Sequence, residues 1–204
     1  MRYILLFVFW VAWCVVHSAM ISTTVVRFVS GRLGRASRFY RLFFNFIALA
    51  TLVPIVLYGR SLQSAWAFRW SGATLVVPAI LLAIGMALLV TGARHYDLLR
   101  FLGLRQLGES ASGIGLTETG HLDTTGVLGV CRHPWYAGAI ALLWVGHLDA
   151  ARLVTNLILT SYLVAGTFLE ERKLVAELGD EYREYQRRVP MLLPIGFLMK
   201  KSIT

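Results

Sequence analysis

Long runs of apolar residues dominate the chain, and short polar stretches separate them. Three runs hold about twenty residues with almost no charge, the length that an α-helix needs to cross about 30 Å of hydrocarbon. A longer apolar block follows residue 135, and its polar positions His147, Asp149 and Arg152 divide it into two antiparallel helices. The pattern predicts an all-α integral membrane bundle of about five transmembrane helices, the fourth of them short. Their ranges are 3–21, 40–59, 72–92, 136–148 and 152–169.

The polar segments predict where a ligand-binding part would lie. Residues 93–131 are rich in glycine, which indicates a loop with at most one short helix near residues 98–107. Residues 172–188 have the pattern of an amphipathic helix, and the apolar residues 191–197 are too few to span a membrane. We find no repeat or domain boundary, so the sequence predicts one domain over residues 1–204, with a cofactor-binding segment at 93–195 that ends in cytoplasmic helices.

Composition and charge support the membrane interpretation. A hydrophobic content of 57% and a mean hydropathy of +0.64 are too high for an ordinary soluble domain. The net charge of +9 suggests nucleic acid at first, but arginines fill one short stretch, residues 27–41, that contains no acidic residue. Such clusters mark cytoplasmic loops. Placing this loop inside leaves only Arg2, Arg60, Arg69 and Arg152 outside, with the other sixteen of the twenty Lys and Arg residues inside.

The charge distribution therefore predicts a protein of the bacterial inner membrane, with its N-terminus outside and its C-terminus in the cytoplasm. Cleavage of the first span as a signal peptide is disfavoured, because the apolar run is longer than a signal core. Cys14 lies within that span and Cys131 lies on the cytoplasmic side, so we expect no disulfide. The histidines and cysteines show no metal-ligand spacing. Nothing in the sequence indicates the oligomeric state.

Two polar motifs stand at the ends of apolar segments. Arg132-His133-Pro134 opens the fourth span, and Glu170-Glu171 closes the fifth. Charged groups at such positions are costly unless they pair with each other, with water or with a polar ligand, so they nominate a functional site. The two motifs should face each other on the cytoplasmic side.

These motifs resemble those of the isoprenylcysteine carboxyl methyltransferase superfamily of integral membrane enzymes. The resemblance rests on residues 132–138, on 170–172, and on 179–190 with Pro194. His95-Tyr96-Asp97-Leu98 and the segment 103–106 resemble the bacterial branch that includes NnrU-like proteins and methanethiol S-methyltransferase-like proteins. The resemblance covers residues 90–195 well and the first ninety residues mainly by hydropathy.

The resemblance implies binding of S-adenosylmethionine. Arg132 suits its carboxylate, and a glutamate suits its ribose hydroxyls or ammonium. Aromatic rings can face its adenine or its sulfonium. The candidate cofactor-binding residues are Arg132, His133, Pro134, Tyr136, Glu170, Glu171, Tyr182, Tyr185 and His121. The candidate catalytic residues are Arg132, His133 and His17.

Plainer interpretations of these residues remain open. Arg132 can simply extend the positive cluster, and the glutamates can pair with Arg172 or Lys173. Histidines within spans, such as His17 and His147, are more often satisfied between helices than catalytic.

The resemblance also bears on the methyl acceptor. The isoprenylcysteine enzymes carry Gly-Pro-Tyr ahead of Arg-His-Pro, whereas this chain has Gly126-Val127-Leu128 without the aromatic hydroxyl. We therefore expect a small or lipid-phase acceptor, foremost a thiol. The alternatives are a prenylcysteine carboxylate, a phospholipid amine, an NADPH-dependent membrane reductase, and a non-catalytic protein of the denitrification-linked NnrU type.

Overall fold

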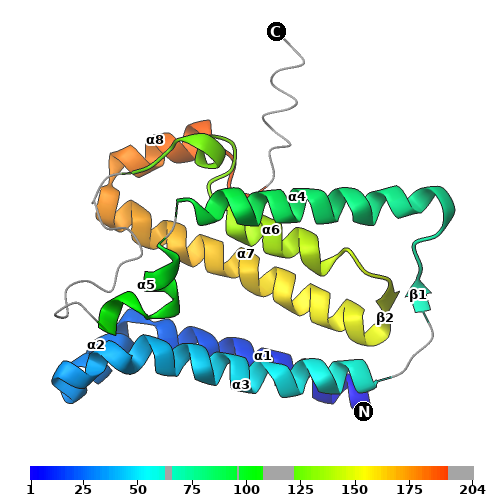
Figure 1. Ribbon diagram of the computed structural model, residues 1–204, viewed down its shortest axis with the longest axis horizontal. Helices are drawn as coiled ribbons and strands as arrows, with labels where there is room; N and C mark the ends of the chain where they lie inside the picture. The colour runs from blue at the N-terminus through cyan, green and yellow to red at the C-terminus, as the bar shows by residue number, and fades with distance from the viewer. Residues whose placement is uncertain (63–65, 96, 108–121, 193–204) are drawn as a thin grey trace, which may run out of the picture. The chain divides into compact units, whose positions relative to one another are not determined.

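The computed structural model describes residues 1–62, 66–95, 97–107 and 122–192, and these form a helical protein (Figure 1). The α-helices are α1 (Arg2–Ile21), α2 (Thr23–Leu33), α3 (Tyr40–Ser61), α4 (Val76–Ala93), α5 (Leu98–Leu102), α6 (Pro134–Leu143), α7 (Ala150–Leu178) and α8 (Asp180–Arg188). The 3₁₀ turns are η1 (Gly34–Phe39), η2 (Gly72–Leu75), η3 (Arg105–Leu107) and η4 (Gly126–Gly129). Two short strands, β1 (Trp66–Phe68) and β2 (Leu148–Asp149), pair with each other.

The described residues contain four helical segments that are long and apolar enough to cross a membrane, which confirms the predicted fold class. They are Arg2–Ile21, Thr23–Ser61, Gly72–Ala93 and Ala150–Leu178. The first three predicted spans coincide with α1, with α3, and with η2 together with α4. The sequence locates these helices well because an uninterrupted apolar run of about twenty residues has few other folded uses.

The fourth predicted span, 136–148, differs from the structure. α6 has only 10 residues and ends at Leu143, so it rises about 15 Å, half of what a crossing requires. The residues that follow leave the helix and lead to β2. His147, predicted to be a satisfied polar residue, accepts a hydrogen bond from the Trp70 amide at 3.1 Å through Nδ1.

Two stretches of the structure differ from the layout that the sequence suggests. The arginine-rich stretch predicted as a loop is helical, because Ser22 caps α2 by accepting from the Val25 amide and no proline interrupts the following turn. The fifth span was predicted as residues 152–169 with an amphipathic helix after it, whereas α7 is one helix of 29 residues that runs from Ala150 to Leu178. Its charged positions did not end the helix, because charge alone breaks no backbone hydrogen bond. Gly179, with a φ of 61°, follows its last residue.

The chain separates into two compact units. The first holds α1, α2, α3, α5 and the start of α7 as far as Ile158, and the second holds α4, α6, α7 from Leu159, and α8. In the first unit, the buried Trp10 of α1 donates its indole N–H to Thr155 Oγ1 of α7 at 2.9 Å. Asn45 of α3 donates to the carbonyls of Phe101 and Leu102, which holds α5 against α3.

In the second unit, α4 and α6 pack with their backbones close together. A Cβ at Gly138 would lie 2.9 Å from the Gly85 carbonyl oxygen, and one at Gly85 would lie 2.8 Å from Leu142. The contact continues where the Trp135 ring packs against Gly92. The Trp135 indole also donates to the Leu89 carbonyl at 3.1 Å. Small residues permit such close packing of apolar helices, which have no hydrophobic driving force between them in lipid.

The helices α6 and α7 run antiparallel, as the sequence predicts. Trp144, just past α6, donates its indole N–H to Thr160 of α7 at 3.1 Å. Further from the connection, Tyr136 contacts Gly166, and beyond it Arg132 contacts Glu171. This arrangement places the start of α6 beside the later turns of α7.

Candidate active site

Backbone hydrogen bonds fix the segment that carries Arg132 and His133. The segment follows η4, whose first residue, Gly126, has a φ of 56°, a left-handed conformation that favours glycine. The amides of Arg132 and His133 donate to the carbonyls of Pro190 and Met191 at 3.0 and 3.1 Å. The residues after α8 therefore pair with this segment and hold it in place.

Arg132 and Glu171 form a buried ion pair, and each side chain is 8% exposed. Arg132 Nε and Nη2 both lie 2.7 Å from Glu171 Oε1. The Nη1 group donates to the carbonyls of Gln186, at 3.0 Å, and of Val189. The Gln186 side-chain amide donates to Glu171 Oε2 at 2.8 Å. One arginine thus connects the start of α6, α7 and the end of α8.

This network uses most of the hydrogen-bond donors of Arg132. Four of the five N–H groups of a guanidinium are directed at Glu171 and the two carbonyls among the described residues. A bidentate contact with a ligand carboxylate would compete with these bonds. Removing one partner of such a buried pair leaves an uncompensated charge.

His133 lies between the two glutamates and is 3% exposed. Its Nε2 lies 3.2 Å from Glu171 Oε1, and its Nδ1 lies 3.7 Å from Glu170 Oε2. Burial lowers the pKa of His133, although both carboxylates act in the opposite direction. The neutral imidazole has one N–H. If Nε2 donates to Glu171, the lone pair of Nδ1 faces Glu170 Oε2. Neither Nδ1 nor Glu170 Oε2 then carries a hydrogen to share.

Glu170 has one carboxylate oxygen to which a ligand could donate a hydrogen bond. Its side chain is 32% exposed, yet its Oε2 is buried and accepts no hydrogen bond from the part of the chain that the structure describes. Burying a carboxylate oxygen without a donor is costly. A ligand ammonium or hydroxyl that donates to Glu170 Oε2 would remove this cost, and S-adenosylmethionine carries both groups.

The first turn of α6 positions Tyr136 beside His133. Pro134 is the first residue of α6, where its missing N–H costs no hydrogen bond, and it is buried. The rings of His133 and Tyr136 meet edge to face with centroids 5.7 Å apart. Tyr136 also lies against Gly166 of α7, where a Cβ would be 3.8 Å from its ring.

Tyr182 and Tyr185 share one face of α8, as their spacing predicts, and that face is buried. The two rings meet edge to face at 5.7 Å and pack with Val189. The Tyr185 hydroxyl donates to the Leu128 carbonyl at 2.6 Å, which connects α8 to η4. Burial raises the pKa of Tyr182. Both tyrosine side chains are therefore buried.

Comparison with known proteins finds relatives that are similar in sequence. The chain is 31% identical over 157 residues to methanethiol S-methyltransferase of Mycobacterium tuberculosis, covering 74% of this chain and 62% of the relative. It is 30% identical over 143 residues to a methanethiol S-methyltransferase of a Pseudomonas species, covering 69% and 52%. It is 34% identical over 109 residues to methanethiol S-methyltransferase 2 of Bradyrhizobium diazoefficiens, covering 53% and 40%.

The chain is a homologue of the methanethiol S-methyltransferases. This confirms the branch that the sequence motifs indicated. The chain spans between 40% and 62% of the length of these three relatives. No family model matches the chain, and no solved structure matches it.

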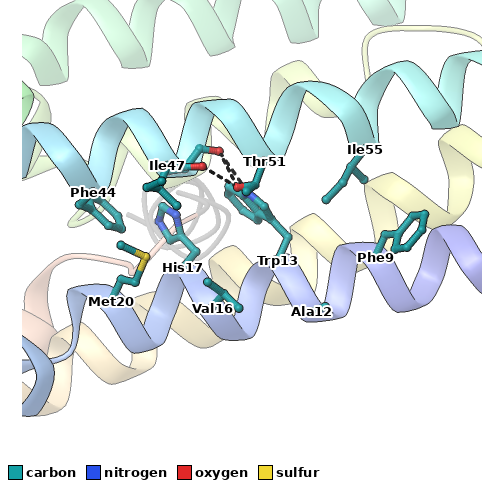
Figure 2. Close-up of a pocket in the computed structure, with 11 residues that line it drawn as sticks. Phe9, Ala12, Trp13, Val16, His17, Met20, Phe44, Ile47, Thr51 and Ile55 are labelled. Atoms are coloured by element: carbon teal, nitrogen blue, oxygen red, sulfur yellow. Dashed lines mark hydrogen bonds between the residues drawn. The ribbon is translucent and has the colours of Figure 1, made fainter.

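His17, the third candidate catalytic residue, belongs to the first unit, whereas Arg132 and His133 belong to the second. Figure 2 shows it in an apolar pocket between α1 and α3, between the rings of Trp13 and Phe44, whose centroids lie 4.7 and 4.9 Å from the imidazole. The Trp13 indole donates to the Ala48 carbonyl at 3.2 Å. His17 is thus packed among aromatic rings. His121, the remaining candidate, lies outside the described residues.

Sequence reasoning missed two contributors in the second unit. Gln186 binds Glu171, but a glutamine on a polar helix has no distinguishing pattern. His95 and Asp123 are joined by a hydrogen bond in which Nδ1 and Oδ2 lie 2.7 Å apart. The sequence offered one signal for this pair. His95 follows α4 and Asp123 precedes η4, so packing of η4 against the end of α4 would bring the two side chains together.

Proposed function

We propose that this protein is an integral membrane methyltransferase that uses S-adenosylmethionine and methylates a small or lipid-soluble thiol. The proposal rests on the buried oxygen of Glu170, which has no donor among the described residues and lies near His133, the neighbour of Tyr136. Homology to proteins named methanethiol S-methyltransferase supports the reaction class and the acceptor.

The residues around Glu170 have separate tasks in this proposal. Glu170 accepts hydrogen bonds from the ammonium or the ribose hydroxyls of the cofactor, and Tyr136 presents an aromatic face to it. Glu171 holds His133 and Arg132 in position through contacts at 3.2 and 2.7 Å. S-adenosylmethionine supplies an already activated methyl group, so the chain contributes orientation, exclusion of water and a proton acceptor for the thiol.

The residues of η4 favour a thiol acceptor over a prenylcysteine carboxylate. Leu128 contributes its backbone carbonyl to Tyr185 and carries no side-chain hydroxyl. A carboxyl or phospholipid N-methyltransferase remains the alternative within the same enzyme class. An NADPH-dependent reductase and a non-catalytic NnrU-type protein are the alternatives from other classes.

The decisive experiment incubates the purified full chain with S-adenosylmethionine labelled in its methyl group and a panel of acceptors. We expect label in the thioether product of methanethiol or a related thiol. Calorimetric titration with S-adenosylhomocysteine and with NADPH accompanies it. Binding of NADPH alone would support the reductase, and transfer of label only to a prenylcysteine or a lipid amine would replace the thiol.

The arginine-rich α2 and η1 support a location in the bacterial cytoplasmic membrane with α2 on the inner side. The described arginines of this segment, Arg27, Arg32, Arg35 and Arg38, are exposed. In this orientation the N-terminus lies outside, and Arg132 and Glu171 face the cytoplasm, where S-adenosylmethionine is made.

A further inference from the structure

His95 and Asp123 form a fixed dyad in the second unit. His95 follows α4, and its Nδ1 lies 2.7 Å from Asp123 Oδ2. The other carboxylate oxygen, Oδ1, accepts from the Thr125 amide at 2.9 Å and from the Thr125 hydroxyl at 2.7 Å. These bonds lower the pKa of Asp123 to about 2, so the carboxylate is ionised at neutral pH. Three hydrogen bonds therefore fix its orientation.

The dyad defines which nitrogen of His95 can take a proton. An ionised carboxylate only accepts hydrogen bonds, so His95 Nδ1 carries the hydrogen and Nε2 carries the lone pair of the neutral ring. Within the described residues Nε2 makes no hydrogen bond. Gly126 lies beside it: a Cβ there would be 3.1 Å from Nε2. The side chain of His95 is 17% exposed, which leaves the ring accessible to a small molecule.

The dyad lies near the segment that carries His133. The His95 amide donates to the Gly92 carbonyl at 3.0 Å. A Cβ at Gly92 would lie 3.3 Å from Pro134, the residue after His133. On its other side, Gly126 begins η4, the turn that leads to Arg132. His95 thus lies within one helical turn of the contact between α4 and the start of α6.

His133 is less suited to accept a proton from a substrate. Both of its nitrogens face carboxylates, and its side chain is 3% exposed. The arrangement of His95 is the one in which a carboxylate orients an imidazole and leaves the far nitrogen as a base.

We propose that His95 Nε2 is the proton acceptor for the thiol substrate and that Asp123 is its positioning residue. This inference rests on the proposed function. The thiol S–H proton passes to Nε2, and the sulfur lone pair forms the new bond to the methyl carbon. The bond from that carbon to the sulfonium breaks, and its electron pair stays on the sulfur of S-adenosylhomocysteine. The imidazolium then releases the proton to solvent.

The test compares two thiols that differ in acidity, using the full chain and S-adenosylmethionine. Methanethiol must lose its proton in the site, since an alkyl thiol has a free pKa of about 8.5. A nitro-substituted thiophenol is already a thiolate at neutral pH. We expect His95→Gln to lower kcat for methanethiol by about 100-fold or more, the usual range for a general base, and to leave the arylthiol rate at the wild-type level. Asp123→Asn should show the same selectivity with a smaller loss.

Controls separate this inference from the proposed function. His147→Gln, a histidine of the same unit that accepts from the Trp70 amide, should leave both rates unchanged. Equal loss for both thiols in His95→Gln, or no loss for methanethiol, would overturn the role of His95 while the wild-type activity still stands. Wild-type protein that methylates neither thiol would instead refute the proposed function.

A second measurement does not depend on turnover. Diethyl pyrocarbonate acylates an accessible imidazole nitrogen with a free lone pair, and mass spectrometry locates the product. We expect His95 to be modified, His133 to be spared, and methanethiol with S-adenosylhomocysteine to protect His95. Modification of His95 at an equal rate with and without the thiol would contradict the proposal.

Discussion

Arg132 and Glu171, 39 residues apart in the chain, share one buried ion pair in which Arg132 Nε and Nη2 both approach Glu171 Oε1 at 2.7 Å. Both side chains are 8% exposed, and the pair joins the second residue before α6 to the last third of α7. This pair affects the stability of the fold, because removing one partner leaves the other charge buried without compensation.

Arg132→Ala should destabilise the second unit by about 3 to 5 kcal/mol, because Glu171 would stay buried without its cation. Thermal unfolding in detergent measures the change. The matched control is Arg183→Ala, which removes an exposed pair with Asp180 at 2.8 Å and should cost less than about 1 kcal/mol. Equal effects of the two substitutions would mean that the buried pair contributes no more than a surface pair.

Glu170→Gln should weaken the binding of S-adenosylhomocysteine without destabilising the protein. Its Oε2 makes no hydrogen bond with the described residues, so the folded chain loses little. The ligand loses a charge-assisted contact of about 1.5 to 3 kcal/mol, which corresponds to roughly a 10- to 100-fold higher Kd. Titration calorimetry checks this. Glu177→Gln, on the exposed side of α7, is the control, and an unchanged Kd in Glu170→Gln would remove Glu170 from the ligand site.

Cysteine labelling should report the orientation of the chain. With Cys14 and Cys131 replaced, Ser37→Cys in η1 should react only from the cytoplasm, and Ser71→Cys before η2 should react from outside. An impermeant maleimide added to intact cells distinguishes them. Labelling of Ser37→Cys from outside would invert the topology.

The methylation rate at saturating cofactor should rise between about pH 6 and pH 8.5 if the acceptor is an alkyl thiol, whose free pKa is about 8.5. Asp123 stays ionised over this range because its pKa is about 2. A carboxylate acceptor is ionised throughout and needs no proton removal. A flat profile, with prenylcysteine accepted and small thiols ignored, would restore the carboxyl methyltransferase alternative.

The sequence predicted the elements whose signal is local. The apolar runs located α1, α3 and α4, and the polar residues at the ends of two spans predicted that Arg132 and Glu171 would face each other. It also predicted that Tyr182 and Tyr185 share a face.

The sequence could not show how the site's hydrogen bonds are distributed. The carbonyls of Gln186 and Val189 that receive Arg132 are backbone atoms and leave no trace in residue types. The pairing of His95 with Asp123 depends on a return of the chain across a glycine-rich segment, which hydropathy does not encode. Helix α2 was missed because a dense arginine cluster was read for its charge alone, although Ser22 supplies a cap.

The contact between Gly85 and Gly138 has a consequence for how this protein could be altered. Because backbone touches backbone there, the two glycines set the distance between α4 and α6 at this level. An added methyl group at either glycine would push α6 away from α4, and its N-terminal residue, Pro134, would move with it. His133 directly precedes Pro134, so the position of its imidazole depends on a contact between two glycines that take no part in the ion pairs around it.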